Sequence, residues 1–215
     1  MKMKKLLIII LFFIGKLTFS QEKIDYGLNV GINYFNVRGN DFADQYNYDF
    51  GFLIGITFEY TLKNNFSVIT GINYEKKNTI NENSNTLDSN GNVLGNAVIK
   101  EKFDYLNLPI LLKINFNNSF FLNGGPYISY LLSSETEIDS SVSETVSNID
   151  STDRFKKVDL GLSFGIGKGF KLNEKNNLNF EIRYNLGVTN ISDVPVINNG
   201  KIKTNSMNLL MGLTF

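Results

Sequence analysis

The sequence predicts an all-β fold, namely an eight-stranded antiparallel transmembrane up-and-down β-barrel. Three observations support this prediction. First, apolar and polar residues alternate with a period of two in eight segments, each about as long as a tilted membrane-spanning strand. Second, the connections between these segments are short and long in turn. Third, one face of the segments collects glycines and charged residues, whereas the other collects aliphatic and aromatic residues.

The eight segments are read from the alternation. The clearest is LNFEIRYNLGVT, in which apolar residues from Leu178 to Val188 occupy one face. Polar residues and one glycine, from Asn179 to Thr189, occupy the other face, as in a strand between two unlike environments. The predicted strands are 26–35, 49–62, 66–77, 102–116, 119–132, 156–170, 178–189 and 204–215.

The connections alternate in length. Short ones at 63–65, 117–118 and 171–177 alternate with long ones at 36–48, 78–101, 133–155 and 192–203. This layout is typical of outer-membrane barrels and puts both chain ends on the short-turn side. Asn90 and Gly91 are a turn signal, so the second long connection could extend the barrel as a hairpin above the membrane. The acidic stretch 133–153 is interpreted as a solvated surface loop, with divalent-cation binding as a weaker alternative.

Two features predict that the polar face points into the barrel, whereas a soluble lipocalin-like barrel would have an apolar interior. Strand glycines fall on the polar face, with Gly124 as the exception, and crowding inside a narrow barrel explains them better than open solvent does. Aromatic residues of the apolar face gather at both strand ends, as in the two aromatic girdles of a membrane barrel. We therefore expect the protein in the cell outer membrane.

The first 20 residues read as a secretory signal peptide. A basic head, MKMKK, precedes the apolar run LLIIILFFIG, and Thr18 and Ser20 are small residues before Gln21. The alternative is an N-terminal membrane anchor, but the run is shorter than the roughly 20 residues needed to span a bilayer. A lipoprotein anchor is excluded because the chain has no cysteine. Residues 21–215 then form the barrel domain.

The charge balance gives no reason to expect a nucleic-acid partner. Cleavage after residue 20 removes four of the 21 basic residues and none of the 21 acidic ones, which leaves a net charge of −4. The absence of histidine and cysteine excludes Ser-His and Cys-His nucleophile pairs and metal sites built on these ligands. We therefore expect no catalytic residue, no cofactor and no metal, and a protein that is not an enzyme.

Inward positions of the predicted strands include several charged residues, which we interpret as an ion-pair network that fills the lumen and leaves no continuous channel. Two alternatives are a gated pore and a catalytic carboxylate pair, and the second is disfavoured because substrate could not easily reach such depth. The predicted network residues are Glu59, Glu75, Lys113, Asp159, Glu181 and Arg183.

The chain ends on an alternating strand with a terminal aromatic residue. Met211, Leu213 and Phe215 share the apolar face of this strand. Such an ending resembles the signal by which outer-membrane barrels are recognised for insertion, and it implies the barrel-insertion machinery as a partner. The alternative is an ordinary edge strand of a soluble protein.

Several segments resemble the PorT-like outer-membrane β-barrel family of Bacteroidota. They are YGLNVGIN at 26–33, YLNLPILLK at 105–113, GGPYISY at 124–130, DLGLSFG at 159–165 and FEIRYNLG at 180–187. The resemblance covers nearly all of residues 21–215. It implies an eight-stranded barrel and little about activity, although the best-known branch is tied to protein secretion across the outer membrane.

The function expected from the sequence is non-enzymatic. We predict a structural or accessory outer-membrane barrel with a plugged polar lumen, whose surface loops contact a partner. The alternatives are an accessory component of protein secretion, which would bring secretion-system proteins as partners, and a small channel. The remaining expected partner is outer-membrane lipid.

Overall fold

The computed structural model describes residues 24–63, 65–116, 119–142, 146–174 and 176–215. The predicted signal peptide lies outside these residues. The strands are β1 (Ile24–Arg38), β2 (Asn47–Lys63), β3 (Phe66–Leu87), β4 (Val93–Asn115), β5 (Phe120–Ser140), β6 (Ser147–Asp150), β7 (Val158–Lys171), β8 (Asn177–Gly187) and β9 (Lys203–Thr214). Short 3-10 turns are η2 (Ala43–Gln45), η3 (Thr152–Arg154) and η4 (Ile197–Asn199). None of the helices in the described part is long and apolar enough to cross a membrane.

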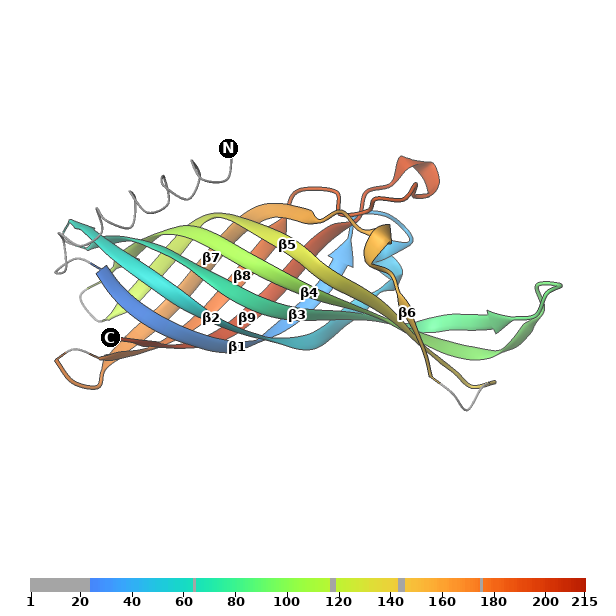
Figure 1. Cartoon of the computed structure of the whole chain (residues 1–215), viewed down its shortest axis with the longest axis horizontal. Helices are drawn as coiled ribbons and strands as arrows, with labels where there is room; N and C mark the ends of the chain where they lie inside the picture. Colours follow the sequence, from blue (N-terminus) through green and yellow to red (C-terminus); the bar gives the residue numbers. More distant parts are fainter. Residues whose placement is uncertain (1–23, 64, 117–118, 143–145, 175) are drawn as a thin grey trace, which may run out of the picture.

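Eight antiparallel strands close into a ring, which confirms the predicted fold class. Each strand pairs with the next along the chain, except that β7 follows β5 in the ring, and β1 pairs with β9 to complete it. The first and last strands meet at this closure, and beside it the Phe215 amide donates to the Tyr26 carbonyl over 2.8 Å. β6 lies outside the ring and pairs with the part of β5 that continues beyond the barrel (Figure 1). Closure leaves no strand edge unpaired in lipid.

The glycine face points inward, as predicted. On β7, a Cβ atom at Gly165 would lie 2.3 Å from the Glu181 Oε1 atom, and one at Gly167 would lie 2.2 Å from the Phe121 ring. A third, at Gly161, would lie 2.4 Å from the Tyr127 ring. The lumen-facing side of β7 is therefore free of side chains at these positions because large side chains of other strands occupy the space.

The outer face is apolar and carries aromatic residues at both ends. Near the short turns, Tyr26 packs on Phe58 with ring centroids 5.6 Å apart, and Phe215 is 47% exposed. Towards the long connections, Phe52 packs on Tyr74 at 6.0 Å. Between the two groups the exposed side chains are mainly aliphatic. A belt of this kind matches the hydrocarbon layer of a bilayer with its two interfaces.

Two of the predicted long connections are largely strand. Residues 78–101 form the outer ends of β3 and β4 with a turn at 88–92, which confirms the predicted hairpin. Residues 133–140 continue β5, and Ser147–Asp150 is the additional strand β6, so the interpretation of 133–153 as a loop is wrong for these two parts. Charged residues on the outward face, such as Lys102 with Glu135 at 3.3 Å, show that this extension is surrounded by water. The result is a twisted sheet of β3, β4, β5 and β6 that projects past the barrel (Figure 1).

A register irregularity marks where the projecting sheet leaves the barrel. Tyr105 pairs with Leu131, but Asp104 pairs with Ser133, so one residue of β5 is bulged. Beyond this bulge the even-numbered residues of β5 face inward, and Ser134 and Thr136 are buried. Bulges redirect side chains in this way at barrel rims.

Candidate functional site

The lumen near the short turns holds four of the charged residues named from the sequence. The Lys113 Nζ atom lies 2.8 Å from the Glu59 Oε2 atom. The Arg183 Nε atom lies 2.6 Å from the Glu181 Oε1 atom, and the Arg183 side chain also donates to Oε2 over 2.9 Å. All four carboxylate and cation groups line one hollow that opens at this end of the barrel.

The middle of the lumen is filled by buried polar side chains. Glu75 pairs with Lys77 at 2.7 Å and accepts a hydrogen bond from Asn107, also at 2.7 Å. Asp159 has hydroxyl partners rather than a paired cation, because Thr204 donates to it over 2.6 Å and Thr189 over 3.0 Å. Carboxylates buried in this way are tolerated because each of them is hydrogen-bonded or paired.

Above this polar layer the lumen becomes apolar, which the sequence interpretation missed. Phe103 is 1% exposed and lies at the centre of an aromatic contact set, with Phe35 at 5.7 Å and Phe155 at 4.9 Å between ring centroids. The buried cluster consists of Phe35, Val37, Ala43, Tyr46, Phe103, Tyr105, Leu131, Ile191 and Ile202. This cluster, the apolar plug, closes the barrel at the long-loop end.

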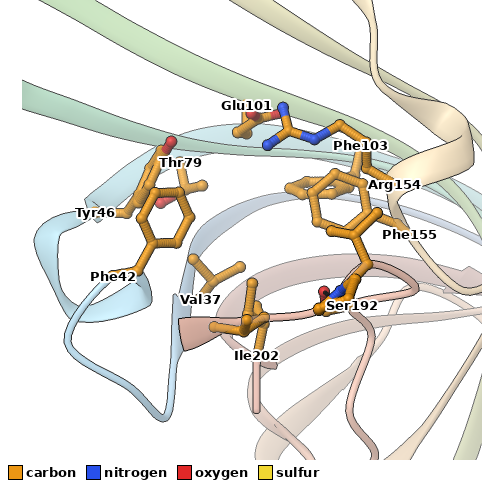
Figure 2. Close-up of a pocket in the computed structure, with 13 residues that line it drawn as sticks. Val37, Phe42, Tyr46, Thr79, Glu101, Phe103, Arg154, Phe155, Ser192 and Ile202 are labelled. Atoms are coloured by element: carbon orange, nitrogen blue, oxygen red, sulfur yellow. Dashed lines mark hydrogen bonds between the residues drawn. The ribbon is translucent and has the colours of Figure 1, made fainter. Parts of the chain in front are cut away.

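A pocket of about 240 Å³ lies on the outer side of the apolar plug (Figure 2). Its walls come from segments far apart in the sequence, which are the end of β1, the η2 turn, β3, β4, the η3 turn and the loop before β9. The apolar walls include Val37, Phe42, Phe103, Phe155, Val194 and Ile202. The polar lining residues are Tyr46, Thr79, Glu101, Arg154 and Ser192.

Glu101 and Arg154 form the polar end of this pocket, and their groups lie on the same side of it in Figure 2. Glu101 is 7% exposed and accepts hydrogen bonds from Thr136 at 2.8 Å and Ser151 at 3.3 Å. Burial raises the pKa of Glu101, although the Thr136 and Ser151 hydroxyls and the Arg154 charge pull the other way. Burial, with a contribution from Glu101, raises the pKa of Tyr46 to about 12, so this phenol stays protonated at neutral pH.

Hydrogen bonds between the loops hold the pocket walls in place. Asn40 accepts from the amides of Phe42 and Ala43, both at 2.9 Å, and thereby begins the η2 turn. Its side-chain amide donates to the Lys201 carbonyl, also at 2.9 Å, which joins the first long loop to the last. The loop before β9 is joined to the η3 segment by the Asp193 amide, which donates to the Arg154 carbonyl over 2.9 Å. The pocket is therefore built before any ligand arrives.

The residues missed by sequence reasoning left different signals. Lys77 has the same parity as Glu75 two positions earlier, so the alternation already placed it inside. Glu101 and Arg154 left no such signal, because both were assigned to loops. In the described part of the chain, no group of three or more acidic, histidine or cysteine side chains is placed to hold a metal ion. Met211 and Phe215 lie on the lipid-facing side, 45% and 47% exposed.

These features define an outer-membrane β-barrel, with a closed antiparallel ring, an apolar outer belt, and short turns at one end opposite long extensions at the other. The chain belongs to the family described as outer membrane protein beta-barrel domain, which matches residues 19–193. The protein is therefore located in the cell outer membrane, with the long extensions on the cell exterior and the short turns in the periplasm.

Matches among solved structures include three proteins, all of low sequence identity. The chain is similar to Ail, the attachment invasion locus protein of Yersinia pestis, with 14% identity over 90% of this chain and 99% of that chain and a TM-score of 0.44. It is also similar to Neisserial surface protein A, with 12% identity, 88% and 95% coverage and a TM-score of 0.42. The outer membrane protease OmpT from Escherichia coli has 11% identity, 90% and 96% coverage and a TM-score of 0.42. The comparison with curated proteins finds no match.

Proposed function

We propose that this protein is a non-enzymatic outer-membrane barrel with a plugged lumen, which contacts a macromolecular partner through its projecting sheet. The observation that supports this most is the contrast between the two parts of the molecule. The lumen is filled with paired charges and an apolar plug, whereas four strands continue outside the membrane as a sheet. A barrel that only conducted solutes would not need such an extension.

The filled lumen argues against a channel. The pocket at the outer end and the hollow at the periplasmic end have no lining residue in common. Buried side chains of Asn33, Asn73, Tyr105 and Asn208 lie in the lumen, each 2% exposed or less. In planar-bilayer recordings we expect no steady unitary conductance, and a stable conductance step would show that the lumen is open.

The projecting sheet has the features of a contact surface. Leu94 and Val93, at the tip, are 55% and 62% exposed, and Ile149 on β6 is 51% exposed, all outside the membrane belt. β6 is the last strand in the sheet order, so its outer edge has no strand neighbour in the described part of the chain. Exposed apolar residues beside a free strand edge favour binding of an extended segment of another protein.

The test is site-specific photo-crosslinking in intact cells. A photo-reactive amino acid at Leu94 or Ile149 should give a discrete adduct of higher mass after illumination. The matched control is Leu172, which is 58% exposed at the periplasmic end and should not give the same adduct. Adducts at neither outer position, in a strain that makes the folded barrel, would contradict the proposal.

Protein secretion is the second candidate, and it is supported by the resemblance to the PorT-like family of Bacteroidota. We would delete the gene and compare the proteins in the medium and on the cell surface with those of the parent. Cargo held inside the deletion strain and released on complementation would favour a secretion component. An unchanged export profile would favour the surface-contact function. The predicted lumen residues have a structural role in both cases.

A further inference from the structure

The pocket above the apolar plug has the size and walls of a small-molecule site. Its volume of about 240 Å³ exceeds that of the engineered cavity of about 150 Å³ that binds benzene in another protein. Phe103 and Phe155 stand at one wall, with Val37 and Ile202 at the base in Figure 2. The space therefore suits one aromatic ring with a short substituent, which would stack or pack edge-on against these rings.

The polar end of the pocket offers a cation for a ligand. Among the described residues, none makes an ion pair or hydrogen bond with the Arg154 guanidinium, although seven ion-pair contacts are formed elsewhere. The Glu101 carboxylate beside it already accepts hydrogen bonds from Thr136 and Ser151. A guanidinium binds a carboxylate through two parallel hydrogen bonds, which an ammonium group cannot do.

The position of Arg154 on the chain suits this role. Thr152 accepts a hydrogen bond from the Ser134 amide over 2.9 Å, and its own amide donates to Asp150 over 2.9 Å. The η3 turn is thus held to the rim of the barrel, while the Arg154 side chain remains exposed at the pocket entrance. Glu101, on which the Arg154 charge also acts, is only 7% exposed, so a ligand carboxylate would approach the guanidinium from its exposed side.

We propose that this pocket binds a small aromatic monocarboxylate, with the ring against Phe103 and Phe155 and the carboxylate on the Arg154 guanidinium. The pocket borders the base of the projecting sheet at Thr79 and Glu101, but its lining includes neither the tip of that sheet nor β6. The proposal is therefore independent of the proposed surface contact. It faces the cell exterior, and the apolar plug beneath it separates the ligand from the lumen.

The experiment measures binding to the folded barrel in lipid nanodiscs, with empty nanodiscs as the background. The probe is 4-ethylbenzoate, and its neutral counterpart is 4-ethylbenzamide, which has the same ring and substituent. Binding is followed by saturation-transfer NMR and by calorimetry. We expect saturable binding of both compounds, with the carboxylate bound more tightly.

Three variants separate the contributions. Arg154→Gln should weaken the binding of 4-ethylbenzoate about fivefold, which corresponds to the energy of an exposed charge pair. The affinity for 4-ethylbenzamide should not change. Lys157→Gln is the matched control, because Lys157 is an exposed cation three residues away that does not line the pocket. This variant should bind the carboxylate and the amide with unchanged affinity. Val194→Trp places a large ring in the pocket from a residue that is 42% exposed, and it should abolish binding of both compounds.

Each variant must first migrate as a folded barrel on a gel without boiling. If the carboxylate and the amide bind equally well to the unmodified chain, or if Arg154→Gln leaves the carboxylate affinity unchanged, the assigned role of Arg154 is wrong. If Val194→Trp leaves binding intact, or if no saturable binding exceeds that of empty nanodiscs, the pocket is not the site.

Discussion

Lys77 and Glu75 form an ion pair inside the barrel, with 2.7 Å between the Nζ and Oε2 atoms and 2% of each side chain exposed. They lie two residues apart on β3, so both point into the lumen. Lys77 also lies 5.1 Å from the centre of the Tyr105 ring, at the border between the polar layer and the apolar plug. This pair therefore connects the polar layer of the lumen with the apolar plug.

Replacing Lys77 by methionine should destabilise the barrel strongly. The substitution leaves the Glu75 carboxylate buried without its cation, which typically costs about 3–5 kcal/mol. The midpoint of thermal unfolding, followed by the migration of unboiled samples, should fall markedly. The double variant Glu75→Gln, Lys77→Met removes both charges and keeps an acceptor for Asn107, so it should regain most of the loss. Equal midpoints for the single and double variants would contradict this explanation.

Gly167→Ala should destabilise the barrel, whereas Gly212→Ala should not. A Cβ atom at Gly167 would lie 2.2 Å from the Phe121 ring and 2.5 Å from the Phe180 carbonyl oxygen, but at Gly212 the nearest heavy atom is 3.7 Å away. Overpacking of this kind costs about 1–3 kcal/mol. The comparison uses the fraction of protein that resists denaturation at a fixed temperature. Similar losses for both variants would mean that crowding in the lumen is not the reason for these glycines.

Truncation of Phe103 should loosen the outer mouth of the barrel. Phe103→Ala removes a ring that is 1% exposed and contacts Phe35 and Phe155, so we expect the free energy of unfolding to fall by about 3–5 kcal/mol. Amide hydrogen exchange should accelerate in residues 188–202, which pack over the apolar plug. Leu94→Ala, at the exposed tip of the projecting sheet, is the control and should change stability by less than about 0.5 kcal/mol. Unchanged exchange in the Phe103 variant would show that the plug does not hold the loop.

Glu101 should make stability fall as the pH rises. Because burial raises its pKa in the folded protein, the folded state holds this proton more tightly than the unfolded state does. Its contribution is most favourable at low pH and is lost as the pH rises from the ordinary value of 4.5 through the raised folded value. The variant Glu101→Gln lacks this loss, so its unfolding midpoint relative to the parent should increase between acidic and neutral pH. A constant difference would refute the assignment to Glu101.

Phe215→Ser should reduce the amount of barrel in the outer membrane without an equal loss of stability. We predict from the sequence that Met211, Leu213 and Phe215 form an insertion signal, and Phe215 pairs with Tyr26 only through backbone atoms. The measurement compares the folded fraction in isolated outer membranes with the unfolding midpoint of protein refolded in vitro. A fall in both to the same degree would assign Phe215 to stability rather than to recognition.

The barrel could be predicted from the sequence because every spanning strand has one face toward lipid, which is apolar, and one face toward the lumen, which is largely polar. Residues such as Ile182 and Arg183 must lie on opposite faces, and this alternation is local. The contrast disappears outside the membrane, where both faces of a strand meet water. Residues 78–87, with their polar run NENSN, therefore looked like a loop although they continue β3.

The pocket could not be predicted for a different reason. Its geometry depends on contacts between distant segments, such as the hydrogen bond from Asn40 to the Lys201 carbonyl. Charge pairs across strands, such as Glu59 with Lys113, likewise depend on the register between strands, which alternation does not specify.

In the proposed function, the length of β4 outside the membrane would set how far from the cell surface the partner is bound. From Asp104 to Val93 the extended chain spans roughly 35 Å, about the thickness of the hydrocarbon layer that the barrel crosses. A target held at the tip would stand clear of the lipid headgroups and of neighbouring proteins of low profile. In the proposed function, the closed barrel would anchor the projecting sheet, and the partner would be bound without touching the membrane.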